Sequence, residues 1–463
     1  MYPPIRTVRA KMDATGIGYA GIEGVWWLPA CQPFVWPQPL QLHLADIGAA
    51  LFHFLDGVWT VLKNRSDPEL AAQLRQKVPA RLLACCHLDP VLSVRPDFQL
   101  VPTSDPARPW RPVLTEIEIA PSAQGFAHAM QVGYGLPTDL ADCFATFLAG
   151  RTLLFVGTAQ WSEFLFEQLA FCRALAERGA TAFVLYDRSL QALTAEIAQG
   201  KRWEPPLFGV PTRPASWNLD LPARLRRQGL EAFWLEEWPE QVGSALLFRF
   251  GYLENFSRAQ LAQLAAWQAN GATFLNPLAY PLDSKVLLAA LQRPSVRDQI
   301  PAAQRALLDD AIPATHLLTP ALVPQLQQEQ AAWLVKYAGF DGGGAAWGGR
   351  SVEIGLEQSA EAWRDRLARA LELPWPVVAQ RLTPSAQLTA EAVRPDGTVA
   401  TYAGSSRLRT FFLRTAGGET LSCGAHVTLS PGLRVSEGTE SVQGPVAFRP
   451  LPEEGGSRLS PPA

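Results

Sequence analysis

The middle of the chain alternates short apolar runs with helical stretches, and this alternation limits the possible folds more than any other feature. Leu153 to Gly157 is an apolar run of strand length, and a helical stretch from Trp161 to Arg178 follows it. Similar apolar runs lie at Thr181 to Tyr186, Glu231 to Leu235 and Ala245 to Phe250. Because strands that alternate with helices form βαβ units, residues 151–275 are predicted to form a small parallel α/β layer. No GxGxxG motif follows the first run, so this layer is not predicted to bind a dinucleotide.

The regions on either side follow other patterns. Residues 1–150 read as largely irregular, with a helix from Leu44 to Leu62 and a predicted hairpin. The hairpin strands are Val91 to Val101 and Pro112 to Ile119, which are separated by a turn-rich segment. Residues 276–449 combine a helix at Ser284 to Gln292 with six predicted strands: Ala331 to Val335, Ser351 to Ile354, Val377 to Leu382, Thr398 to Tyr402, Leu408 to Leu413 and Thr420 to Val427. Residues 450–463 are rich in Pro, Gly and Ser and are expected to form a disordered tail.

Length and charge exclude some classes of protein. A chain of 463 residues is too long for one ordinary core, so we expect two or three packed units. The net charge of −3 provides no general attraction to nucleic acid or to an anionic membrane, and neither is expected as a partner. No signal peptide and no uninterrupted apolar run of membrane-spanning length is expected either. The six cysteines form no CxxC motif, so we expect buried free thiols and a reducing cytoplasm.

A lysine that is followed by glycines is the first candidate for chemistry. Lys336 ends an apolar run, and the segment after it contains Gly342, Gly343 and Gly344. Glycines allow backbone N–H groups to approach an anion closely, and a lysine adds a compact positive charge, so this pattern is typical of phosphate binding. The order differs from the Walker motif, in which the lysine follows the glycines. The alternative is a flexible hairpin loop with an exposed lysine.

Acidic residues on the predicted hairpin form a second candidate site. Arg95 and Asp97 share one face of the first strand, and Glu116 and Glu118 share one face of the second, because side chains alternate along a strand. If these faces coincide, three carboxylates converge, and oxygen ligands of this kind suit Mg²⁺. The alternative is a polar sheet face held together by salt bridges.

Four further residues attract attention for their charge or polarity. Lys285 opens a helix after a proline-containing turn, although an isolated lysine there is usually exposed to solvent. Gln380 follows an apolar run. Arg407 and Arg409 share a strand face, where they could clamp a phosphate or a carboxylate or be ordinary exposed arginines.

Taken in order, these motifs resemble the synthetase domain of glutathionylspermidine synthase and its ATP-grasp relatives. The similarity covers residues 90–430 and rests on four segments: Arg95-Pro96-Asp97-Phe98, Glu116-Ile117-Glu118, Ser284-Lys285, and Lys336 with the glycines after it. The resemblance implies an α/β fold of mixed α+β character, similar to ATP-grasp proteins. It divides the chain into an N-terminal region with the acidic hairpin (1–150), a small pre-ATP-grasp layer (151–275), a nucleotide-binding region (276–449) and a tail (450–463).

The resemblance also assigns roles to the candidate residues. Asp97, Glu116 and Glu118 would hold magnesium, and Lys285 and Lys336 would contact ATP. The backbone of Gly342, Gly343 and Gly344 would cover the phosphates, Arg95 would steady the reacting groups, and Gln380 would lie at the edge of the adenine pocket. Two departures are clear: Glu118 stands where the family has asparagine, and the loop lacks the family's Arg-Glu-Gly core. Glu437 and Glu440 lie in a segment without an assigned counterpart and are possible further ligands.

The implied activity is ATP-dependent ligation of a small carboxylate to an amine through an acyl phosphate. This chemistry requires cations and carboxylates that position charge, not a nucleophilic Ser or Cys. The alternative is a catalytically inactive protein of the same fold that binds nucleotide as a sensor or scaffold. The identities of the acid and the amine and the oligomeric state do not follow from the sequence.

Overall fold

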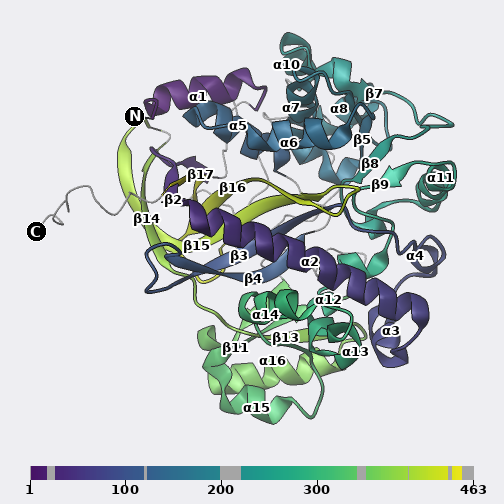
Figure 1. The fold of residues 1–463 in the computed structure, drawn as a ribbon, viewed down its shortest axis with the longest axis vertical. Coiled ribbons are helices and arrows are strands. Elements are labelled where there is room, and N and C mark those ends of the chain that lie inside the picture. Colours follow the sequence, from purple (N-terminus) through teal and green to yellow (C-terminus); the bar gives the residue numbers. More distant parts are fainter. Residues whose placement is uncertain are drawn as a thin grey trace, which may run out of the picture.

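Three bodies are stacked along the long axis of the molecule. The computed structural model describes residues 2–17, 27–118, 123–198, 221–340, 351–394, 396–435 and 441–450. Figure 1 shows a parallel α/β layer at the top, a large sheet across the middle and a smaller sheet with its helices at the bottom. The candidate site residues come from all three bodies, so the way in which the bodies meet determines the site.

The upper layer is a parallel sheet, as the sequence predicts, and it has five strands, one more than predicted. Its strand order is β7-β6-β5-β8-β9. The strands are β5 (Leu153–Val156), β6 (Ala182–Leu185), β7 (Trp234–Leu235), β8 (Leu246–Arg249) and β9 (Thr273–Phe274). The connecting helices include α7 (Leu165–Ala176), α8 (Leu190–Ala198), α10 (Leu221–Arg227) and α11 (Arg258–Ala269). From β5 the sheet extends through β6 and β7 on one side and through β8 and β9 on the other. In sheets of this kind, a crevice forms at the carboxyl ends of the two strands where the order switches, here β5 and β8.

One predicted strand of this layer is much shorter than expected. Only Trp234 and Leu235 of the predicted run from Glu231 to Leu235 are extended. The preceding residues, Leu230–Phe233, form a 3-10 helix that follows Gly229, whose φ is 65°. Because a left-handed residue turns the chain sharply, the strand begins only after this turn.

The middle sheet has eight strands from both ends of the chain. Its order is β1-β17-β16-β15-β3-β4, with β14 paired to β15 and β2 paired to β17. The strands are β1 (Trp27–Pro29), β2 (Phe34–Pro37), β3 (Ser93–Pro102), β4 (Trp110–Glu118), β14 (Gln387–Val393), β15 (Val399–Arg414), β16 (Thr420–Ser430) and β17 (Ser441–Arg449). Residues predicted to belong to the first and third regions therefore share one sheet.

Strand β15 corrects another expectation. The sequence predicts two strands, Thr398 to Tyr402 and Leu408 to Leu413, but β15 runs without a break through both. The small residues between them resemble a turn, yet they pair with β14 and β16. Gly404 is needed in this region because a Cβ atom there would lie 2.4 Å from the Ser430 carbonyl oxygen. The glycine thus allows close packing of strands instead of ending one.

Helices are more frequent in the first 150 residues than the sequence pattern suggests. They are α1 (Ile5–Ala14), α2 (Gln38–Asn64), α3 (Pro68–Arg75), α4 (Ala80–Ala84), α5 (Gln124–Tyr134) and α6 (Asp139–Leu148). Helix α2 crosses one face of the large sheet (Figure 1). It is the one helix in the described part of the chain that is long and apolar enough to cross a membrane, but 67% of its apolar window is buried inside the protein. Its apolar side chains are therefore explained by packing in the core.

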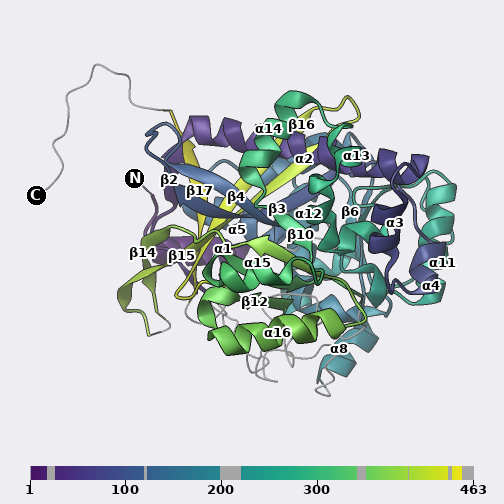
Figure 2. The same cartoon turned by 90° about the horizontal axis from the view of Figure 1, so that it is seen from below.

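The lower body is a small lobe built on an antiparallel sheet. The sheet order is β10-β13-β11-β12, with β10 (Thr315–Leu317), β11 (Trp333–Tyr337), β12 (Val352–Ile354) and β13 (Val377–Arg381). Helices α15 (Val323–Gln328) and α16 (Ala360–Glu372) lie on its outer side in the view from below (Figure 2). One sheet face buries Trp333, Val335 and Ala379 against α16. The opposite face, which carries Lys336, therefore points toward the large sheet.

The connection from the α/β layer to the lobe is a series of short helices. These are the 3-10 helix η5 (Tyr280–Asp283), then α12 (Val286–Ala289), α13 (Pro294–Arg297) and α14 (Ala302–Ala311). Arg293, which precedes α13, donates two hydrogen bonds to the Asp67 carboxylate at 2.8 and 3.0 Å. Asp67 also caps α3 by accepting a hydrogen bond from the Leu70 N–H, and Pro68 occupies the first helical position. Burial opposes the ionisation of Asp67, but these hydrogen bonds outweigh it and lower its pKa to about 2.

We expect Asp67→Ala to lower the free energy of unfolding by about 1–2 kcal/mol at neutral pH, as is typical for the loss of an N-cap. The folded-state pKa of about 2 lies below the ordinary value of 3.8, so the carboxylate stabilises the fold above the ordinary pKa and loses this effect as the pH falls through about 2. The difference in melting temperature between the wild type and the variant should therefore shrink as the pH falls across this window. Ser359→Ala, which removes the N-cap of α16, is the control without a carboxylate. A difference that does not change with pH would contradict this account.

Candidate functional site

The predicted acidic hairpin is present, and its faces coincide. Strands β3 and β4 pair antiparallel, with Arg95 opposite Glu118 and Asp97 opposite Glu116. The register shifts between Asp97 and Phe98, where Thr115 is an extra residue in β4. A bulge of this kind bends a strand and turns its polar groups out of the ladder, and bulges are frequent beside active sites. All four predicted side chains are therefore close together on one face, next to an irregularity in the backbone.

Lys336 reaches this bulge from the small lobe. Its Nζ donates a hydrogen bond to the Thr115 carbonyl oxygen at 2.7 Å. The residue is only 6% exposed, so the expectation of an exposed lysine is wrong. Burial lowers the pKa of Lys336 to about 8; Glu116 opposes this effect and Lys285 adds to it. The buried amine of Lys336, on strand β11 of the small lobe, therefore lies at the edge of the large sheet.

Lys285 arrives at the same place from the connecting segment. Its Nζ lies 3.3 Å from a carboxylate oxygen of Glu116, and its side chain is 6% exposed. The Ser284 hydroxyl donates to the Ala338 carbonyl oxygen at 2.9 Å, which ties this segment to the chain just after β11. A cavity of about 20 Å³ lies between this segment and β4, and its lining includes Glu116, Glu118, Tyr252 and Lys285. The two lysines predicted to contact nucleotide therefore meet adjacent residues of β4, Thr115 and Glu116.

Asp97 has different surroundings from the two glutamates. Its carboxylate lies within 3.5 Å of Arg95, Arg407 and Arg409, and it is 5% exposed. Burial opposes its ionisation, but Arg95, Arg409 and Arg407 outweigh that effect and hold its pKa at about 2. Arg407 and Arg409 therefore contact a carboxylate and are not ordinary exposed arginines, and salt bridges hold this part of the sheet. In the described part of the chain, no group of three or more His, Cys, Asp or Glu side chains is arranged to hold a metal ion.

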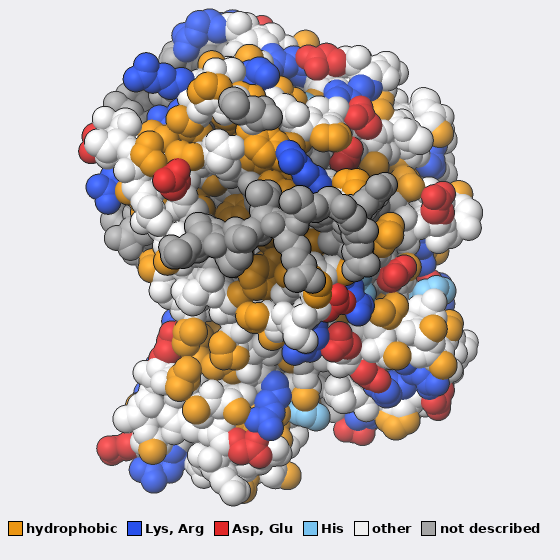
Figure 3. All heavy atoms as spheres, turned by 60° about the vertical axis from the view of Figure 1, so that its left-hand side comes forward, with side chains coloured by type: hydrophobic (Ala, Val, Ile, Leu, Met, Phe, Trp, Pro, Cys, Tyr) orange, Lys and Arg blue, Asp and Glu red, His pale blue; other side chains and the backbone are white. Residues whose placement is uncertain are grey.

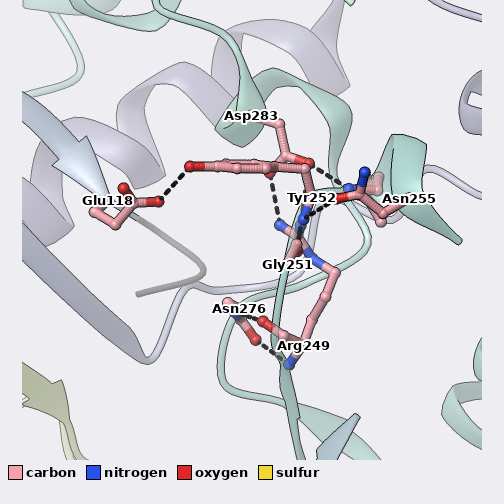
Figure 4. Close-up of polar contacts among 8 residues, drawn as sticks. Glu118, Arg249, Gly251, Tyr252, Asn255, Asn276 and Asp283 are labelled. Carbon is pink, nitrogen blue, oxygen red and sulfur yellow. Dashed lines mark hydrogen bonds and ion pairs between the residues drawn. The ribbon is translucent and has the colours of Figure 1, made fainter. Parts of the chain in front are cut away.

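Glu118 links the hairpin to the α/β layer. It accepts a hydrogen bond from the Tyr252 hydroxyl at 3.2 Å (Figure 4). The Arg95 guanidinium lies 3.8 Å from its other carboxylate oxygen. Burial raises the pKa of Glu118 to about 7; Arg95 opposes this, while Glu116 and Asp97 add to it. Tyr252 follows β8, so this contact joins the carboxyl end of a parallel strand to the acidic hairpin.

A buried ion pair holds the segment that carries Lys285. Arg249, the last residue of β8, donates two hydrogen bonds to Asp283 at 2.8 and 3.0 Å, and both side chains are almost inaccessible to solvent. Figure 4 shows the guanidinium between Asp283 and the Gly251 carbonyl, and the Asn276 amide on the Arg249 backbone. Because Asp283 is two residues before Lys285, this pair positions the lysine. Burial raises the pKa of Asp283, and Arg249 opposes that effect.

Arg249 and Tyr252 are the site residues that the sequence analysis missed. Their position in the sequence could have identified them. Arg249 ends a buried strand of a parallel layer, and ligands commonly bind at the carboxyl ends of such strands. Without the contacts, Arg249 reads as an ordinary charge at the end of a strand.

Two predicted groups have different outcomes. Gln380 is 1% exposed and donates to the Thr315 hydroxyl at 3.0 Å. It stands opposite Leu334, two strand positions from the pair formed by Lys336 and Val378, so it lies on the same face as Lys336. Gly342, Gly343 and Gly344 lie outside the described residues, as do Glu437 and Glu440.

In the space-filling view, the small lobe forms the lowest part of the molecule and projects from the body above it (Figure 3).

Comparisons with known proteins define the class of fold. No protein-family model matches the chain, and no curated protein sequence matches it. The structure of a glutathione synthetase-like effector from Globodera pallida in its apo form matches with a TM-score of 0.57 and 10% identity, over 96% of this chain and 97% of that chain. This similarity shows a shared fold: the chain has a mixed α/β fold of the ATP-grasp type.

Two further solved structures match more weakly. A proposed γ-glutamylcysteine synthetase from Methylobacillus flagellatus has a TM-score of 0.39 and 11% identity, over 86% of this chain and 87% of that chain. A carboxyaminoimidazole ribonucleotide synthase from Aspergillus clavatus, complexed with ATP, has a TM-score of 0.25 and 12% identity, over 60% of this chain and 69% of that chain.

The buried amine of Lys336 provides a direct test of the site's electrostatics. We expect its pKa to be about 8, well below the ordinary value of 10.5, because burial disfavours the charged form. Carbon NMR of labelled lysine side chains measures this value, and the Lys336→Met spectrum assigns the signal. Since the folded-state pKa lies below the unfolded one, protonation of this amine disfavours folding at neutral pH. Lys336→Met should therefore be at least as stable as the wild type, and a pKa near 10.5 would contradict the described burial.

Proposed function

We propose that this protein is an ATP-dependent carboxylate–amine ligase that forms an amide bond through an acyl phosphate. One observation carries the proposal: Lys285 and Lys336 are both buried against adjacent residues of β4, Lys285 at the Glu116 carboxylate and Lys336 at the Thr115 carbonyl oxygen. Burying two amines next to each other is electrostatically unfavourable, so their arrangement is better explained by an anionic ligand than by stability. The ATP-grasp-type fold supports the same reaction class.

The described side chains fit a bound nucleotide. Lys285 and Lys336 would contact the phosphates of ATP, and Gln380 would border the adenine from the same face of the small sheet. Gly342, Gly343 and Gly344 follow Lys336 and are proposed to cover the phosphates with their backbone N–H groups. ATP, when bound, supplies the phosphoryl group that activates the carboxylate. The protein's contribution would be to position the reactants and to offset the charge that develops on them.

Glu116 and Glu118 fit magnesium better than Asp97 does. Magnesium in phosphate sites commonly takes one or two carboxylates together with phosphate oxygens and water. Glu116 has 30% of its side chain exposed and faces the lysines, and Glu118 is beside it on β4. Asp97 is surrounded by three arginines and would become a ligand only by releasing them. We therefore propose Glu116 and Glu118 as the main ligands, with Asp97 as the third.

Arg95 is proposed to steady the reacting groups. It lies between Asp97 and Glu118, at 3.5 and 3.8 Å, and is 4% exposed. A guanidinium held on both sides by carboxylates keeps its position as charge moves to the transferred phosphoryl group, and such preorganisation is the main electrostatic source of catalysis. The substrates would be a small-molecule acid and a small-molecule amine. The resemblance to glutathionylspermidine synthase favours an acid of the peptide or amino-acid type.

The test of this function is the consumption of ATP. Lys336→Ala and Glu116→Gln should each reduce ADP release, measured with mixtures of candidate acids and amines, by about 10²–10³-fold or more, because each removes a charge that acts on the phosphates. Lys63→Ala and Glu372→Gln change exposed residues outside the site and serve as matched controls. Circular dichroism and melting temperature show whether each variant is folded. Undiminished turnover in either site variant would refute the assignment.

A nucleotide-binding protein without turnover is the second candidate. The arginines around Asp97 favour it, because they leave fewer carboxylates free for magnesium than the resemblance implies. In that case ATP with magnesium would raise the melting temperature of the wild type, since a ligand that binds the folded state stabilises it. ADP would not appear with any acid and amine, whereas the ligase releases ADP when both substrates are present.

A further inference from the structure

Two cysteines from distant parts of the chain meet away from the candidate active site. Cys143 is in the middle of α6, and Cys423 is in β16 of the large sheet. Both side chains are free thiols, each affects the pKa of the other, and α6 packs directly against β16. The sulfur of Cys143 is also 4.0 Å from the Ser422 carbonyl oxygen, and that of Cys423 is 3.6 Å from the Leu421 carbonyl oxygen. Each thiol is thus held next to the backbone of the same short stretch of β16.

Regular structure fixes both cysteines. Cys423 belongs to the buried core shared by the α/β layer and the large sheet, and Cys143 packs against that core from α6. A helix and a central strand move little relative to each other when a core is packed to normal density. The proximity of the two thiols is therefore a lasting feature of the fold. A disulfide requires this kind of proximity, because its bond length and dihedral angle tolerate little variation.

The two thiols differ in reactivity. A hydrogen bond from Cys423 lowers the pKa of the Cys143 thiol, against the effect of burial. Burial raises the pKa of the Cys423 thiol, and it does the same for Cys85, Cys86 and Cys172. Since the thiolate is the reactive form, Cys143 is suited to react first, with Cys423 as its partner.

A cavity lies beside the two elements that carry the pair. It has a volume of about 920 Å³ and lies between α2, the end of α6 and the turn that joins β15 to β16. Thr146 and Phe147, one helical turn after Cys143, line one wall, and Leu421, which shares a strand face with Cys423, lines another. Small molecules can therefore come within one turn of the helix of the reactive thiol.

We propose that Cys143 and Cys423 form an oxidant-sensitive dithiol that closes to a disulfide and fastens α6 to β16. Hydrogen peroxide is the oxidant for this step. The Cys143 thiolate attacks one peroxide oxygen, the O–O bond breaks, and hydroxide takes up the thiol's proton to leave as water. The Cys423 thiol then attacks the sulfenic sulfur of Cys143, forming the S–S bond and releasing a second water. Two thiols are oxidised and one peroxide is reduced to two waters.

The direct test is peptide mapping of the full chain. The reduced protein is treated with hydrogen peroxide, remaining thiols are alkylated, and the digest is analysed by mass spectrometry without reductant. We expect one linked peptide pair containing Cys143 and Cys423, two hydrogens lighter than the separate peptides, which dithiothreitol reverses. The oxidised protein should have a higher melting temperature than the reduced protein, because a cross-link between distant residues restricts the unfolded chain.

Matched variants separate this proposal from general oxidation. Cys143→Ser and Cys423→Ser should each abolish the linked pair and the rise in melting temperature, whereas Cys172→Ser should retain both. If Cys423→Ser does not fold, alkylation of the native wild type provides the second measurement, with Cys143 reacting roughly tenfold or more faster than the buried Cys172. Sulfinic or sulfonic acid on Cys143 without a linked peptide, or a rise in melting temperature that persists in Cys143→Ser, would overturn the proposal.

Discussion

The hydrogen bond from Lys336 to the Thr115 carbonyl oxygen is the contact on which the rest of the site depends. It joins the small lobe to the large sheet, and it places a buried amine beside Glu116 and Lys285. Thr115 is the extra residue in a bulge of β4, which is the last strand in the order of the large sheet. Lys336 therefore meets the backbone of an edge strand at an irregular position. A local irregularity in one strand thus creates the position at which two bodies meet.

A second joint, between the α/β layer and the connecting segment, holds the other lysine. The pair of Arg249 and Asp283 is almost fully buried, and the loss of one partner would leave an uncompensated charge inside the protein. A well-packed apolar pair would stabilise the same position at least as well. Asp283 lies two residues before Lys285, so we infer that the ion pair orients the backbone that carries this lysine. A directional bidentate contact does this more tightly than apolar packing.

The charges at the centre of the molecule are distributed unevenly. Arginines lie around Asp97 and hold its pKa low, whereas burial raises the pKa of Glu118 and lowers that of Lys336. Groups whose charged forms are disfavoured by burial do not help the protein fold at neutral pH. Such groups concentrate at functional sites, and the proposed ligase explains their presence here as preparation for a highly charged ligand.

Sequence patterns predicted the parallel layer and the shared face of the hairpin, because strand alternation and βαβ order are local properties of the chain. The order of motifs shared with the glutathionylspermidine synthase family also predicted that Lys285 and Lys336 lie in one site. They could not predict the bulge at Thr115, since any residue can occupy the extra position. The continuity of β15 and the role of Arg249 were missed for a similar reason: both depend on partners that are distant in sequence.

The most direct test of the central claim is a crystal structure of the full chain with a non-hydrolysable ATP analogue and magnesium. The account predicts that the triphosphate lies within hydrogen-bonding distance of the Nζ atoms of both Lys285 and Lys336, with the metal ion on the carboxylates of Glu116 and Glu118. A nucleotide bound elsewhere, with the two lysines still in contact with Glu116 and Thr115, would contradict it.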